Sequence, residues 1–350
     1  MKKSLDELLD YIQPQPYIVH SENYNSLYET PVLTAGQTFV LGKINETDGV
    51  YPASKAKPII LFDDFTTACK WVDFPFKVKS SACKIIVPKN DANIRYCYYA
   101  MKSIKFDASQ HKRYWISQYS KLQIPSYSSE EESFIVNSLD GISSLIQKKK
   151  TELESLDSLV KSRFMEMFGD VLRNNKNFEI CPFGEYIDQM NIGPFGSDLK
   201  NDSFVPKEQS ACMVYEQKHA IEKTLDVPTR YVNSEKYAYL KRFEIGPGDI
   251  IVSCRGTIGE CWILPKEAPR GIIHPSLMLI KPKDFVNHEF LLHMLERILS
   301  EQTQQGSGVK MAIKAKDLSK INCIKPSRDM QDSFVNFVHL VDKSRFDQRI

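Results

Sequence analysis

The sequence predicts an α/β (α+β) protein made of two similar globular units that are joined by long helices. Three observations predict this class. A strand-rich pattern occurs twice along the chain, a strongly periodic helix separates the two copies, and 350 residues exceed one average domain. The chain therefore divides into a first globular unit (1–128), a helix (129–170), a second globular unit (171–327) and a short final helix (328–350).

Two apolar runs separated by a polar turn form the repeated pattern. In the first copy, residues 57–68 precede a second run at 82–89. In the second copy, residues 246–257 precede a second run at 276–283. These runs are rich in β-branched residues, which predicts strand, turn and strand. Each copy then continues through a helical stretch, a basic loop and a short strand that ends in a proline, and a helix follows.

The helix at 129–170 carries apolar residues on the 4,3 spacing of a heptad seam. The acids Glu130, Glu131 and Glu132 suit its amino terminus, and Gly169 suits the position just past its end. Some 40 residues make a rod of roughly 60 Å, and its single apolar stripe needs a partner. The final helix is the candidate partner, although it covers only about half of the rod. The expected packing positions are Leu139, Ile142, Ile146, Leu153, Leu156, Val160, Phe334, Val338 and Val341.

Charge is unevenly distributed, although the chain as a whole carries only +2. Residues 50–125 hold 13 Lys and Arg against 5 Asp, residues 126–172 hold 5 against 9 acids, and residues 230–325 hold 15 against 10. Two basic blocks flank an acidic one. A polyanion would therefore be bound at two separate places.

The sequence shows none of the usual signals for a membrane, for secretion or for a metal site. Its apolar runs are shorter than the roughly 18 residues of a membrane span, and its first ten residues include acids where a signal peptide would be apolar. The eight cysteines form no C-x-x-C pair. We therefore expect a cytoplasmic chain with mostly buried thiols and without a metal site.

Motifs for catalysis are also missing. The sequence holds no Walker loop, no G-x-S-x-G elbow, no H-E-x-x-H and no G-x-G-x-x-G. Asp63 and Asp64 are adjacent, so on a strand they would point to opposite faces. We expect them to form a turn, and these patterns single out no catalytic residues.

Polar and basic loops supply the candidate DNA contacts. The turn at 193–199 offers free amide groups for a phosphate, although a tight turn with Phe195 plugging the core explains it equally well. The loop at 111–115 joins two cations to two aromatics, and a solvated loop anchored by a buried Trp is the alternative. Arg255 could fork to a guanine edge. The full set is Lys70, Trp71, Lys112, Arg113, Tyr114, Trp115, Gly193, Gly196, Ser197, Arg255, Thr257, Lys310 and Lys314.

The layout of the whole chain resembles the specificity (S) subunits of type I restriction-modification systems. Four stretches carry the resemblance: residues 62–68, 164–169, 193–199 and 248–253. It implies two target recognition domains, each reading one half of a bipartite site in double-stranded DNA. It also implies that two conserved helices pack as an antiparallel coiled-coil-like pair and set the spacer between the half-sites.

The resemblance further implies partners that supply the chemistry. Modification (M) subunits would bind S-adenosylmethionine and methylate adenine, and restriction (R) subunits would use ATP, so this chain itself would bind no cofactor. The final helix is shorter than the family pattern. A truncated chain, a silent or recombining cassette, and completion by another chain are all open. The alternatives in other classes are a stand-alone DNA-modifying enzyme and a non-catalytic coiled-coil adaptor.

Overall fold

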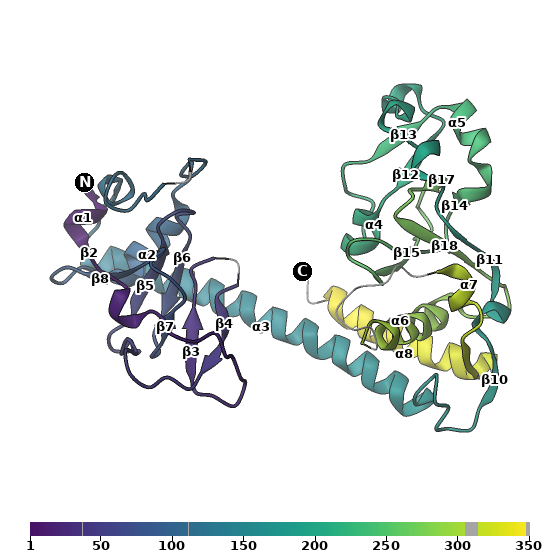
Figure 1. Cartoon of the computed structure of the whole chain (residues 1–350), viewed down its shortest axis with the longest axis horizontal. Coiled ribbons are helices and arrows are strands. Elements are labelled where there is room, and N and C mark those ends of the chain that lie inside the picture. Colours follow the sequence, from purple (N-terminus) through teal and green to yellow (C-terminus); the bar gives the residue numbers. More distant parts are fainter. Residues whose placement is uncertain (37, 111, 305–313, 348–350) are drawn as a thin grey trace. The chain divides into compact units, whose positions relative to one another are not determined.

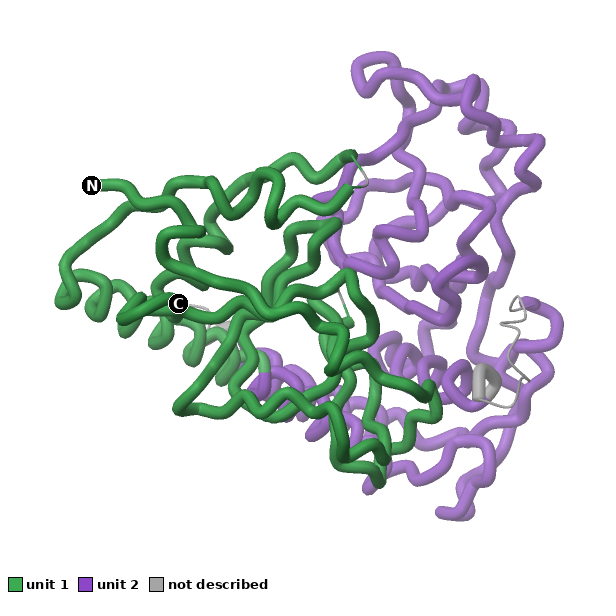
Figure 2. Tube along the Cα trace, turned by 60° about the vertical axis from the view of Figure 1, so that its left-hand side comes forward, with its two compact units in different colours: residues 1–150 green, residues 151–350 purple. Residues whose placement is uncertain are grey.

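The computed structural model describes residues 1–36, 38–110, 112–304 and 314–347. It divides into two compact units, Met1–Lys150 (unit 1) and Thr151–Ile350 (unit 2), which Figure 2 colours separately. The division falls inside the long helix α3, Ser129–Phe168, which is labelled in Figure 1. The sequence-based division instead gives this helix a segment of its own, 129–170.

Unit 1 is built from short strands and two helices that precede α3. Its elements are β1 (Lys2–Ser4), α1 (Leu5–Leu8), β2 (Leu9–Ile12), β3 (Thr30–Leu33), β4 (Val40–Ile44), β5 (Ile59–Asp63), β6 (Cys69–Val72), β7 (Lys77–Val78), β8 (Cys83–Pro88), α2 (Ile94–Ser103) and β9 (Gln123–Pro125).

Unit 2 follows a similar order after the second half of α3. Its elements are β10 (Glu179–Pro182), β11 (Ile187–Ile192), β12 (Cys212–Tyr215), α4 (Gln217–Glu222), β13 (Arg230–Val232), α5 (Ser234–Tyr239), β14 (Glu244–Ile245), β15 (Ile250–Ser253), β16 (Cys261–Ile263), β17 (Gly271–Ile273), β18 (Leu277–Pro282), α6 (His288–Gln304), α7 (Ala315–Leu318), β19 (Asn322–Lys325) and α8 (Arg328–Asp347). The helices α4, α5 and α7 and the strand β14 are additional to the elements of unit 1.

The two units share one sheet topology, which confirms the predicted repeat. The central sheet has the order β2-β8-β5-β6 in unit 1 and β11-β18-β15-β16 in unit 2. A second sheet pairs β3 with β7 in parallel in unit 1, and β12 with β17 in parallel in unit 2. The two-stranded sheets β1-β9 and β10-β19 also correspond. The predicted strand, turn and strand of each copy are β5 with β8 and β15 with β18.

The central sheet of each unit is covered on both faces. Successive strand residues point to opposite faces, so alternate residues of one strand pack into two different cores. In unit 1, Ile60 and Phe62 of β5 pack against α1 and α2, whereas Ile59 and Leu61 face the β3 sheet. In unit 2, Ile250 and Val252 pack with α6 and α8, whereas Ile251 faces the β12 sheet. This explains why both strands are continuous apolar runs.

The ends of α3 follow its predicted signals. The Ser128 hydroxyl accepts the Glu131 amide at 3.3 Å, and the Glu131 carboxylate accepts the Ser128 amide at 2.9 Å, which forms a capping box. At the other end, Gly169 adopts a φ of +67° and its amide donates to the Met165 carbonyl. A left-handed glycine terminates the helix there.

Within unit 2, α8 packs antiparallel against the second half of α3. The Phe334 ring near the start of α8 lies 5.3 Å from the Phe164 ring and 5.7 Å from the Phe168 ring. Arg345, near the end of α8, forms an ion pair with Asp157, about two turns earlier on α3. The helix pair is therefore part of the unit 2 core.

Along the described chain, no helix is long and apolar enough to span a bilayer.

Candidate nucleic-acid interface

Three loops of unit 2 gather at one edge of its central sheet. Strands β11 and β15 both run antiparallel to β18, so the loops that follow them meet the loop that precedes β18. The Gly193 amide donates to the Leu277 carbonyl at 2.8 Å, and the Cys254 amide donates to the Ser276 carbonyl at 2.8 Å. We call residues 193–199, 254–259 and 274–276 the unit 2 loop edge. Five predicted contacts lie on these loops: Gly193, Gly196, Ser197, Arg255 and Thr257.

The glycine-rich turn at 193–199 exposes an aromatic ring. A Cβ at Gly193 would lie 2.3 Å from the His274 carbonyl oxygen, so only glycine allows the two loops to approach this closely. Phe195 is 76% exposed, whereas Leu199 lies in the core. The interpretation that Phe195 plugs the core is therefore wrong, and Leu199 takes that place. Gly196 and Ser197 are exposed beside Phe195.

Arg255 lies on a second exposed turn of the unit 2 loop edge. Gly256 and Gly259 of this turn have φ values of +64° and +92°. The Ser253 hydroxyl accepts the Glu260 amide at 2.9 Å, which closes the turn at its base. The side-chain amide of Gln217, on α4, donates to the carbonyls of Arg255 and Thr257 at 2.7 and 3.0 Å. Gln217 and Ser253 therefore hold the backbone of the turn, while the Arg255 side chain stays exposed.

Further basic side chains surround a carboxylate next to this turn. Glu216 forms ion pairs with Arg230 and Lys218. Burial would raise the pKa of Glu216, but hydrogen bonds from Arg230 and Lys218 outweigh it, and the pKa is lowered. Burial also lowers the pKa of His274, and the charges of Arg230 and Arg255 lower it further against the effect of Glu216. The lowered pKa favours the neutral form of the His274 imidazole.

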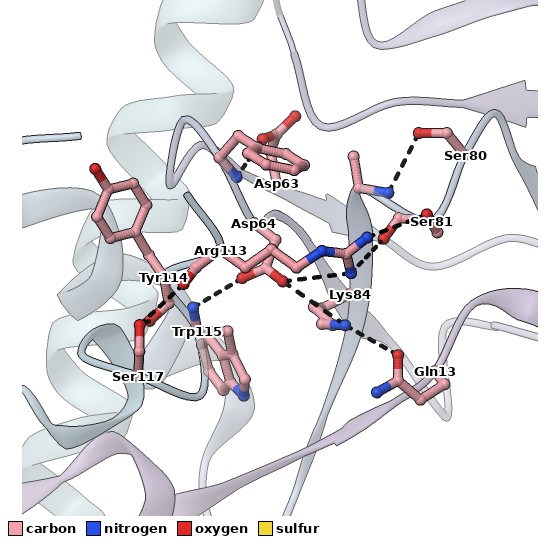
Figure 3. Close-up of polar contacts among 12 residues, drawn as sticks. Gln13, Asp63, Asp64, Ser80, Ser81, Lys84, Arg113, Tyr114, Trp115 and Ser117 are labelled. Carbon is pink, nitrogen blue, oxygen red and sulfur yellow. Dashed lines mark hydrogen bonds and ion pairs between the residues drawn. The ribbon is translucent and has the colours of Figure 1, made fainter. Parts of the chain in front are cut away.

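Unit 1 builds the corresponding edge from Gln13 and residues 63–67, 80–82 and 112–117, which we call the unit 1 loop edge (Figure 3). The Asp64 amide donates to the Ala82 carbonyl at 2.8 Å, the same contact that Cys254 makes with Ser276. The Asp63 carboxylate accepts the amides of Phe65 and Thr66, both at 2.9 Å. The predicted turn at Asp63 and Asp64 is thus confirmed.

Asp64 is a buried carboxylate at the centre of this edge. It is 1% exposed and accepts the Trp115 amide at 2.8 Å. Its Oδ2 lies 3.7 Å from Lys84 Nζ and 3.9 Å from Arg113 Nη1 (Figure 3). Lys84 Nζ also donates to Gln13 Oε1 at 2.9 Å. Burial lowers the pKa of Lys84, and Asp64 opposes this shift. Sequence reasoning missed this network, although an acid directly after an apolar strand was its signal.

Arg113 is the half-exposed member of the same network. Its guanidinium donates to the Ser81 carbonyl and to the Ser81 hydroxyl, both at 3.2 Å, and its side chain is 48% exposed. Lys112 beside it is exposed. Arg113 therefore adds a half-exposed positive charge to a surface that also holds Lys112 and the Asp63 carboxylate.

Tyr114 and Trp115 are buried, which corrects the expectation that they contact DNA. Their exposed fractions are 1% and 2%. The Trp115 ring lies 5.0 Å from the Phe62 ring, and the Tyr114 ring lies 5.1 Å from the Phe106 ring. The alternative interpretation, a loop anchored by a buried Trp, therefore holds for Trp115, and Tyr114 is a second anchor. Both leave Lys112 and Arg113 at the surface.

Four other predicted contacts lie away from the loop edges or outside the described residues. Lys70 and Trp71 are in the middle of β6, where they pair with Leu61 and Ile60 of β5. The Arg95 guanidinium carbon lies 4.3 Å from the centroid of the Trp71 ring. The structure therefore does not bring them together with Arg113. Lys314 is exposed where α7 begins, and Lys310 lies outside the described residues.

The predicted packing positions fall into two groups. Val160, Phe334, Val338 and Val341 are buried in the unit 2 core, and Leu156 packs against it. Leu139 is half-buried, whereas Leu153, Ile142 and Ile146 are 37%, 53% and 66% exposed. The described part of the chain thus leaves much of the apolar stripe open along the first half of α3.

Comparisons with known proteins agree with this architecture. Residues 216–348 match the family model of the type I restriction modification DNA specificity domain. The chain is 46% identical over 160 residues to the type I restriction enzyme EcoR124I/EcoR124II specificity subunit of Escherichia coli. This match covers 43% of the chain but only 39% of that relative.

A solved structure resembles the whole chain. The S subunit of a type I restriction-modification system from M. genitalium shares 14% identity and superimposes with a TM-score of 0.55, over 100% of this chain and 91% of that one. At this identity the likeness concerns the fold alone. The whole chain therefore has a fold similar to that of this S subunit, and residues 216–348 carry the sequence match to the type I restriction modification DNA specificity domain.

Proposed function

We propose that the chain is the DNA-reading subunit of a type I restriction-modification complex, and that each unit reads one half of a bipartite site. One observation carries this proposal. Both units present an exposed arginine at the same edge of a sheet with the same strand order, Arg113 in unit 1 and Arg255 in unit 2. In unit 2 this arginine falls within the matched DNA specificity domain.

The two loop edges suit different parts of a DNA duplex. An arginine fork matches the O6 and N7 acceptors of guanine, a contact worth about 1–3 kcal/mol of discrimination. Lys112 would contact the phosphates as a point charge, and the exposed amides and hydroxyl at Gly196 and Ser197 would do the same. Base contacts would then specify the site, and phosphate contacts would set the register.

We further propose that the chain carries no catalytic group and binds no cofactor. The E. coli relative is named as the specificity subunit of a restriction enzyme, so catalysis would belong to other subunits. Modification subunits would supply S-adenosylmethionine chemistry, and restriction subunits would use ATP. The exposed stripe of α3 at Ile142, Leu145 and Ile146 offers the modification subunits an apolar docking surface.

Methylome sequencing tests the proposed function. A host that carries this gene and its neighbours should show a bipartite, adenine-methylated motif that disappears when the gene is deleted. The purified chain alone should transfer no methyl group from S-adenosylmethionine to DNA. Reproducible transfer by the chain alone would favour the stand-alone enzyme, and binding without sequence preference would favour the adaptor.

The assignment of the two units is tested by arginine variants. Arg255→Ala should relax the preference in one half-site only, and Arg113→Ala should relax it only in the other half-site, whereas Lys112→Ala should weaken binding without a change in preference. Binding to a random duplex library at fixed salt measures both. Arg270→Ala is the matched control, because Arg270 is an exposed arginine of unit 2 that lies at the opposite end of β17 from the unit 2 loop edge. An equal loss of preference at both half-sites, in Arg255→Ala or in Arg113→Ala, would contradict the proposal.

A further inference from the structure

Resting on the proposed function, we infer that Gln217 is a positioning residue that fixes the turn carrying Arg255 and thereby sets the base preference of unit 2. Gln217 is the first residue of α4, and its side-chain nitrogen donates to the carbonyls of Arg255 and Thr257 at 2.7 and 3.0 Å. These carbonyls flank Gly256. One side chain therefore holds both sides of the turn.

The turn needs such a support because its own backbone is permissive. Gly256 and Gly259 both adopt positive φ values. Glycines lose more conformational freedom on ordering than other residues, so an unsupported turn would sample many arrangements. A Cβ at Gly256 would lie 3.3 Å from the Gln217 side-chain nitrogen, so the Gln217 side chain lies directly against the backbone of the turn.

The position of Gln217 is fixed by the residues that precede it in the chain. Gln217 follows β12, whose residues are all buried in the unit 2 core. The preceding Glu216 is held by Arg230, whose guanidinium lies 4.0 Å from the Phe204 ring centroid. The Glu216 amide also donates to His219 Nδ1 at 2.9 Å, and His219 is fully buried. The amide of Gln217 thus projects from a rigid base.

The arrangement leaves Arg255 available and leaves Gln217 engaged. Among the described residues, no carboxylate lies within ion-pair distance of Arg255, and its side chain is exposed. A side-chain amide has two N–H donors, and Gln217 gives both to the turn. Gln217 would have to release the turn in order to read an adenine itself. It acts through Arg255 instead.

The test is a double-mutant cycle in the full chain, together with the modification subunits where binding requires them. Gln217→Ala should lower the preference for the unit 2 half-site about tenfold, since each neutral hydrogen bond contributes several-fold. The preference at the unit 1 half-site and the affinity for mixed-sequence duplex should stay unchanged, while the melting temperature should fall slightly, because two hydrogen bonds are lost. In an Arg255→Ala background, Gln217→Ala should have no further effect on preference.

Two further variants make the result independent of side-chain size and charge. Gln217→Glu keeps the length of the side chain but cannot donate to carbonyls, so it should also lose the preference. Gln209→Glu adds the same charge to an exposed position of unit 2 outside the loop edge and should change nothing. Either Gln217 variant, if folded, decides the question.

The outcomes separate this inference from the proposed function. If Arg255→Ala relaxes the half-site but the Gln217 variants do not, the positioning role is overturned and the function stands. An additive effect of Gln217→Ala in the Arg255→Ala background also overturns it, because Gln217 would then act independently. If Arg255→Ala itself has no effect, Arg255 is not the reader, and the inference fails with that assignment.

Discussion

At the scale of single residues, the two units support their arginines in different ways. Arg113 is oriented by Ser81 and by a buried carboxylate, Asp64. The Arg255 turn is held by a neutral amide, Gln217. The topology is common to both units, but the polar chemistry beneath each loop edge is not. The proposed reading of two different half-sites would use this difference, because each loop would then hold its own shape.

Asp64 and Lys84 form a buried pair whose partners depend on each other. Both side chains are at most 2% exposed, and removal of one partner leaves the other charge without compensation. We expect Asp64→Ala to lower the free energy of unfolding by about 3–5 kcal/mol. Denaturant unfolding of the full chain measures this loss.

A double variant provides the control for this pair. Asp64→Ala combined with Lys84→Met removes both charges, so much of the lost stability should return. Equal instability of the double and the single variant would show that the lost hydrogen bond to the Trp115 amide, and not the unpaired lysine, causes the effect.

At the scale of elements, α3 consists of two halves with different surroundings. In the second half, Phe164 and Phe168 pack against Phe290 of α6 and Phe334 of α8. In the first half, Arg95 of α2 holds Asp140 through an ion pair, while Ile142 and Ile146 stay exposed. The heptad pattern predicts one continuous seam, but it does not say which part is covered within the chain.

A deletion within α3 tests its proposed role as the ruler of the spacer. Removal of Lys148–Thr151 shortens the helix by about 6 Å, which corresponds to about two base pairs at 3.4 Å each. We expect the preferred spacer to shorten by that amount while both half-site sequences stay the same. Selection from a library with variable spacers measures this change.

The matched control removes one whole heptad, residues 145–151, and keeps the seam on nearly the same face of the helix. It should shorten the preferred spacer by about three base pairs. A preferred spacer that is unchanged in both deletions would contradict the proposal that the length of α3 sets the spacer.

At the scale of the whole molecule, the repeated topology hides an unequal distribution of titratable groups. Burial lowers the pKa of three histidines in unit 2, namely His219, His274 and His293, and nearby carboxylates only partly oppose it. Below the ordinary histidine pKa of 6.5, the unfolded chain therefore binds protons that the folded chain does not bind. Stability from this source is complete above that pH and is lost below it.

We accordingly expect the melting temperature of the full chain to fall between pH 7 and pH 5.5. His293 is a suitable site for a variant, because its ring lies 5.2 Å from the Phe334 ring within the unit 2 core. His293→Leu cannot titrate, so the variant should show a smaller fall over the same range. A melting temperature that does not change with pH would contradict the expectation.

By itself, the sequence determined the repeat, the central apolar strands of each copy and the long helix, because these depend on local apolar spacing, capping residues and glycine. It also pointed to Arg113 and Arg255. The tertiary structure alone decided which neighbours of these residues face solvent. For Trp115 the sequence left a DNA contact and a buried anchor open, and the structure buries it together with Tyr114. For Phe195 the sequence left a core position open, and the structure exposes the ring. Gln217 and Asp64 were missed as supports, because each acts on a segment that is distant in the sequence, and only the packing of strands brings those segments together.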